Sequence, residues 1–89
     1  MEEKFLQALE SARLEAEKLG VRIRPVKTMA DARRCLDGHR ESDGFNLLAQ
    51  KGRLELTLEA LSTKKQFAPL FTDDQANNAL NRLLEAGYF

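Results

Sequence analysis

The chain has little of what most catalytic and metal sites require. Its 89 residues contain one cysteine, Cys35, one histidine, His39, and no tryptophan. A single cysteine excludes an internal disulfide and every zinc site built from several cysteines of one chain, and a single histidine excludes a site that needs two imidazoles. Nothing in the sequence resembles a glycine-rich phosphate loop or a Ser/His/Asp arrangement. We therefore expect no cofactor, no metal site and no enzymatic activity.

Net charge and long apolar runs are also missing. Fourteen Lys and Arg residues balance fourteen Asp and Glu residues, so no global field draws the chain towards nucleic acid or an anionic membrane. No apolar run follows a basic start, which argues against a signal peptide and a membrane span. Together with the single cysteine, this predicts a cytoplasmic protein that does not enter a membrane.

What is present is typical of a folded, mainly helical domain. Hydrophobic residues make up 43% of the chain and charged residues 31%, as in ordinary globular proteins. We expect residues 1–89 to form a single helical domain, a compact bundle of about five short helices. The first helix should end at Gly20, and its apolar stripe suits either the domain core or a two-fold interface with a second copy. The stripe consists of Phe5, Leu9, Ala12, Ala16 and Leu19.

Two short helices are expected next. Thr28 followed by Asp31 is typical of a helix start, and the apolar residues that follow predict a second helix ending at Gly38. Ser42 is placed to cap a third helix, which Gly52 would end. The expected buried faces are Met29, Ala32, Cys35 and Leu36 in the second helix and Phe45, Leu48 and Ala49 in the third.

The stretch RLELTLEALS fits two structures. Its leucines alternate as in a strand, yet Leu54, Leu58 and Leu61 also share one helical face. We favour a helix, with Thr57 as an internal start. The main alternative is an α+β fold with a small two-stranded element formed by residues 21–26 and 53–58.

The C-terminal third shows the clearest local signals. In KKQFAPLF the proline predicts a single helical turn and a bend that brings Phe67 and Phe71 into the core. Thr72 and Gln75 have the spacing of a capping box, and Gly87 is placed to end the last helix. The expected apolar face of that helix is Ala76, Ala79, Leu80, Leu83 and Leu84.

Cys35 and His39 are the one pair that could support other chemistry. Their spacing of four would put two ligands on one helix face, and a symmetric dimer could then build a zinc site from two copies. Alternatively, Arg33 and Arg34 could activate Cys35 as a nucleophile by lowering its pKa, and His39 could take its proton. Gly38 should end the helix between Cys35 and His39, however, and the helix dipole there disfavours a thiolate. We favour a small buried thiol beside an exposed histidine.

Charge is unevenly distributed along the chain. Residues 21–40 contain six basic and two acidic residues, whereas residues 1–20 and 41–89 each contain two more acidic than basic residues. These cations could converge on a phosphate-bearing or carboxylate-rich partner. Alternatively, they pair with glutamates of the first helix and lie solvated. The candidate partner-binding residues are Arg22, Arg24, Lys27, Arg33, Arg34 and Arg40.

The C-terminal portion resembles the general plan of a helix-turn-helix in LTLEAL and ALNRLLEAGYF. Its polar residues could read base edges, with asparagine on adenine and arginine on guanine. Asp73 and Asp74 at the start of the last helix would face phosphate, and we favour instead the polar outside of an amphipathic helix. The residues concerned are Asn77, Asn78, Asn81 and Arg82.

The sequence therefore predicts a small cytoplasmic module that is not an enzyme and that binds another protein, or a second copy of itself. Arginines and the terminal Tyr88 and Phe89 are the residue types that tend to anchor interfaces, although these two aromatic residues could also complete the core. The alternative is a nucleic-acid-binding regulator that uses residues 21–40 and the helix-turn-helix-like C-terminal portion.

Overall fold

The computed structural model describes residues 1–38 and 40–88 of the chain. Within these residues the chain forms five α-helices and two 3₁₀ helices, and it contains no strand, so the expected mainly α fold is confirmed. The elements are α1 (Glu2–Lys18), α2 (Met29–Asp37), α3 (Phe45–Gln50), η1 (Leu54–Leu56), α4 (Leu58–Ser62), η2 (Lys65–Leu70) and α5 (Asp73–Glu85). In this part of the chain no helix is both long and apolar enough to cross a membrane.

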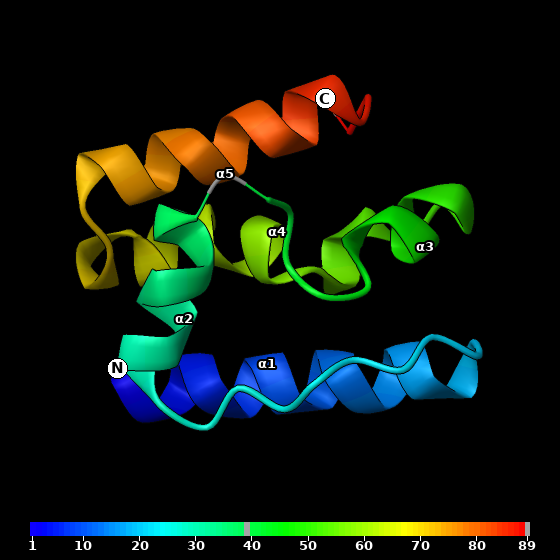
Figure 1. Ribbon diagram of the computed structural model, residues 1–89. Helices are drawn as coiled ribbons and strands as arrows, with labels where there is room; N and C mark the ends of the chain where they lie inside the picture. The colour runs from blue at the N-terminus through cyan, green and yellow to red at the C-terminus, as the bar shows by residue number, and fades with distance from the viewer. Residues whose placement is uncertain (39, 89) are drawn as a thin grey trace.

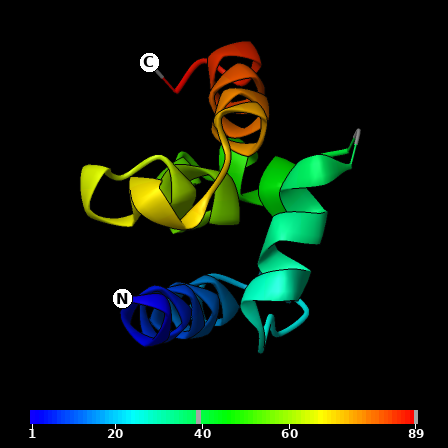
Figure 2. The ribbon, with the colours of Figure 1, turned by 90° about the vertical axis from the view of Figure 1, so that its left-hand side faces the viewer.

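The elements form three layers. α1 lies on one side and α5 on the other, and the row from α3 through η1 and α4 to η2 fills the space between them (Figure 1). α2 stands upright along one flank, where it reaches from α1 to α5 (Figure 2). The extended segment 21–27 runs back along α1 and connects it to α2 (Figure 1).

The apolar stripe of α1 packs inside the protein. Phe5 is fully buried and makes edge-to-face contacts with Phe67 and Phe71, each with ring centroids 5.1 Å apart. The expected insertion of the two aromatic residues next to Pro69 is therefore confirmed, with Phe67 buried and Phe71 half-buried. Because four of the five stripe residues are buried, this stripe is not free to form a two-fold interface. The four are Phe5, Leu9, Ala12 and Ala16.

Three threonine caps begin helices where the sequence predicts them. The hydroxyl oxygen of Thr28 accepts a hydrogen bond from the Asp31 N–H at the start of α2, and that of Thr57 accepts from the Ala60 N–H at the start of α4. Thr72 and Gln75 form the reciprocal capping box of α5. Each cap pairs a backbone donor that the first helical turn leaves unsatisfied.

Helix ends also lie at the predicted glycines. α1, α3 and α5 end with Gly20, Gly52 and Gly87 just beyond them, all at positive φ. After α5, for example, the Tyr88 N–H donates to the Leu83 carbonyl at 2.9 Å, the pattern of a Schellman motif.

The alternative two-stranded element at 21–26 and 53–58 is wrong. The first segment is extended but unpaired, and the second is helical, as η1 followed by the start of α4. Thr57 explains the helical outcome, because its hydroxyl donates to the Leu54 carbonyl at 2.7 Å and accepts from the Ala60 N–H at 3.1 Å. This one side chain therefore ends η1 and begins α4.

The prediction that Ser42 caps α3 is also wrong. The N-cap is Gly44, which has φ +79°, while the backbone N–H and the hydroxyl of Ser42 both donate to the carboxylate of Glu59. A Cβ atom at Gly44 would lie 2.7 Å from Cγ1 of Ile23. Glycine therefore lets the segment 21–27 pack closely against the start of α3.

Candidate functional site

The basic residues of the segment 21–40 do not converge on one point. Lys27 lies in a shallow hollow with Glu2, Glu3 and Glu10 of α1. Arg33 is held by the Leu70 carbonyl, to which its Nε donates at 3.0 Å, and its NH2 lies 3.4 Å from Glu2. These two cations therefore face the acidic start of α1, as the alternative of solvated pairing with glutamates predicts.

Three other arginines line two adjoining hollows. Arg34 and Arg40 line one hollow and Arg24 lines the next, and the two hollows share three residues. Arg34 forms a 3.4 Å ion pair with Asp31 yet its side chain remains 78% exposed. The shared residues are Cys35, Ser42 and Asp43.

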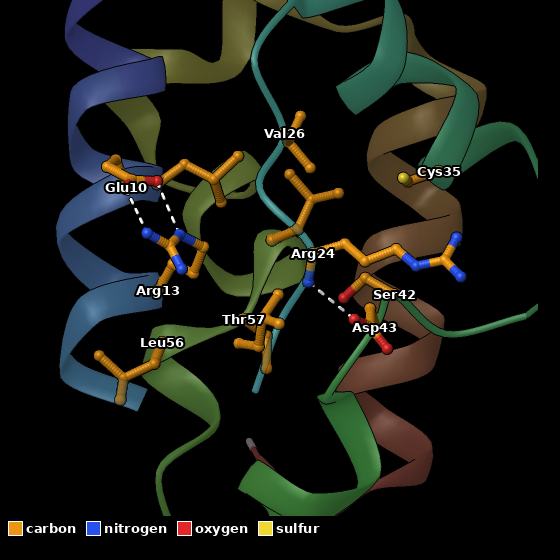
Figure 3. A pocket seen from close by; sticks show the side chains of 12 residues that line it. Glu10, Arg13, Arg24, Val26, Cys35, Ser42, Asp43, Leu56 and Thr57 are labelled. Carbon is orange, nitrogen blue, oxygen red and sulfur yellow. Dashed lines mark hydrogen bonds and ion pairs between the residues drawn. The ribbon is translucent and has the colours of Figure 1, made fainter. Parts of the chain in front are cut away.

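The hollow that Arg24 lines is a pocket of about 230 Å³, which we call the Cys35 pocket. It lies between α1, the segment 21–27, α2 and the turn from η1 into α4 (Figure 3). Ile23 and Val26 of the segment are half-buried against it, whereas Arg22 and Arg24 are exposed. Its apolar wall is Leu9, Ile23, Val26, Leu56 and Leu58.

Charged groups surround the mouth of the Cys35 pocket. NH2 of Arg13 lies 2.6 Å from Oε1 of Glu10, and this hydrogen bond lowers the pKa of the Glu10 carboxyl. Oδ2 of Asp43 accepts a 2.8 Å hydrogen bond from the Arg24 backbone N–H, which fixes the segment 21–27 beside the pocket. Figure 3 shows the side chain of Arg24 extending away from α1, past Ser42. Among the described residues, its guanidinium forms no ion pair.

Cys35 lies half-buried in the pocket wall. Burial raises its pKa, and the negative charge of Glu59 raises it further, whereas the nearby cations Arg82 and Arg34 only partly offset this. Its environment therefore disfavours the thiolate that nucleophilic catalysis needs. His39, considered as its partner in a zinc site or a catalytic pair, lies outside the described residues. Within 1–38 and 40–88, no three His, Cys, Asp or Glu side chains are placed to hold a metal ion.

The structure contains a buried ion pair that the sequence pattern did not predict. Glu59 of α4 is fully buried and Arg82 of α5 is 8% exposed, and Oε2 of Glu59 lies 3.2 Å from NH1 of Arg82. Arg82 also donates to carbonyls at the end of α2, those of Cys35, Leu36 and Gly38. Placing Arg82 on the polar outside of α5 was therefore wrong, whereas Leu84 of the expected apolar face is 57% exposed.

A faint signal for this burial was present in the sequence. Gln75, Ala79 and Arg82 follow one another at spacings of four and three, which places them on one helix face. All three are buried. Because Gln75 and Arg82 are polar residue types, the apolar pattern of the sequence does not mark this face as buried.

The same network removes two of the four base-reading candidates. Asn78 donates from Nδ2 to the Leu36 carbonyl at 2.9 Å, and Arg82 is buried beneath the end of α2. Neither side chain is free to reach a base edge. Asn77 and Asn81 are exposed on α5, downstream of the acidic start at Asp73 and Asp74.

Comparison of the chain with family models, with curated proteins and with solved structures found no match. We therefore infer function from the geometry of the site. The buried network connects helices, whereas the Cys35 pocket and the arginines beside it are open to a ligand.

Proposed function

We propose that the protein is a small non-enzymatic module that binds another protein through the surface around the Cys35 pocket. The observation that carries this proposal is an open apolar pocket of about 230 Å³ with exposed arginines beside it. Interfaces commonly combine a pocket that accepts an apolar anchor with a rim of polar and arginine side chains. A cytoplasmic location remains part of the proposal, on the basis of the single cysteine.

The placement of the cations favours protein over nucleic acid as the partner. A phosphate backbone is bound by many cations along one track, whereas here Lys27 and Arg33 face the acidic start of α1. An apolar pocket does not bind a phosphate group, and the stacking of nucleic-acid bases requires exposed aromatic rings. In the part of the chain that the structure describes, no aromatic residue lines the Cys35 pocket or the hollow beside it, and Tyr88, which is 40% exposed, lies beyond α5 and outside both.

Site-specific photo-cross-linking in cells of the source organism tests the proposal. A benzophenone amino acid replaces Arg24 at the rim of the pocket or, in a second version, Lys65 on η2, remote from it. We expect the version with the benzophenone at position 24 to give discrete cross-linked proteins that the version with the benzophenone at position 65 does not give. Nuclease treatment distinguishes nucleic acid, because cross-links that vanish with nuclease support the alternative partner.

Two matched variants make the test specific for the pocket. Val26→Trp fills the pocket from its wall, whereas Leu47→Trp adds the same side chain at a position on α3 that is 49% exposed. We expect Val26→Trp to reduce cross-linking from position 24 at least tenfold and Leu47→Trp to leave it unchanged, with circular dichroism showing both variants folded. Equal cross-linking by folded Val26→Trp and the wild type would refute the proposal.

A further inference from the structure

The volume of the Cys35 pocket limits what can enter it. Sites for cofactors and drug-sized ligands usually measure about 300–1,000 Å³, and an engineered apolar cavity of about 150 Å³ is large enough for benzene. The Cys35 pocket, at about 230 Å³, lies between these values. It therefore has room for one ring or one branched aliphatic group, and not for a nucleotide.

The polar groups in the pocket wall are already paired. Thr57 is buried, and its hydroxyl donates to Leu54 and accepts from Ala60. Ser42 donates its hydroxyl proton to Glu59, and burial raises the pKa of Cys35, which favours its neutral thiol. In the described part of the chain, every buried side-chain nitrogen or oxygen has a hydrogen-bond partner. Away from the charged mouth of the pocket, an entering polar group would lose water without gaining a partner, so the inner part of the pocket selects hydrocarbon.

The charges around the pocket indicate which kind of molecule the hydrocarbon group belongs to. The pocket, the hollow beside it and the segment 21–27 contain six basic residues against three acidic ones. Arg13 and Glu10 pair with each other, Arg34 pairs with Asp31, and Lys27 faces the acidic start of α1. Among the described residues, Arg22, Arg24 and Arg40 form no ion pair, whereas Asp43 binds the Arg24 backbone. The basic residues are Arg13, Arg22, Arg24, Lys27, Arg34 and Arg40, and the acidic residues are Glu10, Glu41 and Asp43.

The spread of these cations favours a peptide over a small acid. Arg22 and Arg24 lie on the segment 21–27, whereas Arg34 and Arg40 line the neighbouring hollow. One small carboxylate can pair with one of these guanidinium groups, but several carboxylates along a peptide can pair with more of them. We infer that the Cys35 pocket receives one bulky apolar side chain from an acidic peptide segment of the partner, an inference that rests on the function proposed above.

A set of nine-residue synthetic peptides tests this inference on the full chain. The peptides have Asp and Glu flanks around a central Phe, Trp, Leu, Ile or Ala, and a further set has Lys and Arg flanks around the same central residues. Binding is measured by ¹H–¹⁵N chemical shifts and by the rate at which a thiol reagent modifies Cys35. We expect at least one acidic peptide with an apolar centre to shift the Val26 and Leu56 amides saturably and to slow modification of Cys35.

Two comparisons within the peptide set need no protein variant. We expect the acidic peptide with a central Ala to bind at least tenfold more weakly than the best apolar one, because it leaves the pocket empty. The matching basic peptide should also bind at least tenfold more weakly. Equal binding by the alanine peptide or by the basic peptide would overturn the inference, as would a complete absence of binding by the acidic set.

Charge variants and competing ligands complete the test. The double variant Arg22→Ser/Arg24→Ser should weaken the best acidic peptide about tenfold and flatten its salt dependence, whereas Lys64→Ser/Lys65→Ser on η2 should do neither. If 3-phenylpropionate or a twelve-nucleotide single strand binds as tightly as the best acidic peptide, the ligand of the pocket is a small acid or a nucleic acid and not a peptide. A doubled mass in sedimentation, reversed by Val26→Trp, would make a second copy the occupant instead.

The outcomes separate this inference from the proposed function. If Val26→Trp abolishes cross-linking in cells while no acidic peptide binds, the inferred partner chemistry is wrong and the binding module stands. If Val26→Trp cross-links as the wild type does, the proposed function itself fails.

Discussion

Replacing Arg82 by methionine removes the donors of the buried network while keeping a long, unbranched side chain in α5. In the wild type, the guanidinium lies 3.2 Å from the Glu59 carboxylate and donates to three carbonyls at the end of α2. In the Arg82→Met variant, the fully buried carboxylate would keep only the two donors of Ser42. The three carbonyls would lose this donor at the same time.

The expected loss of stability is large because both effects occur in a buried site. Removing one partner of a buried ion pair costs about 3–5 kcal/mol, and we expect a loss in this range for Arg82→Met. At about 0.05–0.15 kcal/mol per residue, a chain of this length has roughly 4–13 kcal/mol of folding free energy. The variant would therefore lose from a quarter to all of it. Glu59→Gln should cost less, about 1–3 kcal/mol, because the single amide oxygen can still accept from Arg82 and the Ser42 N–H, while the amide NH2 can donate to the Ser42 hydroxyl.

Urea unfolding followed by far-ultraviolet circular dichroism measures these losses. Arg34→Met is the matched control, since its side chain is 78% exposed and its ion pair with Asp31 is 3.4 Å long. An exposed pair of this kind contributes less than about 1 kcal/mol. A loss below about 1 kcal/mol for Arg82→Met, with an unchanged dependence on urea, would refute the view that Arg82 holds α2 and α4 to α5.

Three further changes test local features of the fold. Gly44→Ala should lower the free energy of unfolding in urea by about 1–3 kcal/mol, because its new Cβ would lie 2.7 Å from Ile23. The control Gly52→Ala, at φ +71° with open space around it, should lower it by about 1 kcal/mol. Equal losses for the two variants would contradict the close contact at Gly44. Thr72→Ala should cost about 1 kcal/mol and lower the melting temperature, since it removes the cap of α5, and an unchanged melting curve would argue against that cap. Cys35 should titrate at higher pH in thiol labelling of the folded protein than of the urea-unfolded chain, because burial raises its pKa. Its stabilising contribution is then complete below the unfolded pKa and is lost as pH rises through the folded pKa, and equal labelling midpoints would disprove the shift.

Features that depend on a few neighbouring residues could be predicted from the sequence. Thr28 and Thr72 each bond to a backbone N–H three residues ahead, and Gly20 and Gly87 each lie two residues beyond a helix end. These interactions form within one or two turns, so the residue types and their spacing contain the necessary information.

Features that depend on tertiary partners could not be predicted in this way. From its position in the sequence, Ser42 could cap the next helix. Instead, its backbone N–H and its hydroxyl both donate to the buried carboxylate of Glu59, 17 residues away. Arg82 likewise has the polarity of a surface residue and becomes buried because Glu59, 23 residues away, and the end of α2 satisfy its donors. Burial of a charged residue requires such partners, and local periodicity does not reveal where they are.

The same distant partners connect the core to the candidate binding surface. Glu59, paired with Arg82 in the core, holds Ser42, and the adjacent Asp43 accepts from the Arg24 backbone N–H. A continuous set of contacts therefore runs from α5 through α4 to the segment 21–27, which forms one wall of the Cys35 pocket. A wall fixed before binding loses less conformational entropy when a ligand enters, which favours affinity. The buried ion pair therefore stabilises the loop that holds the Arg24 backbone beside the pocket, in addition to connecting α4 with α5.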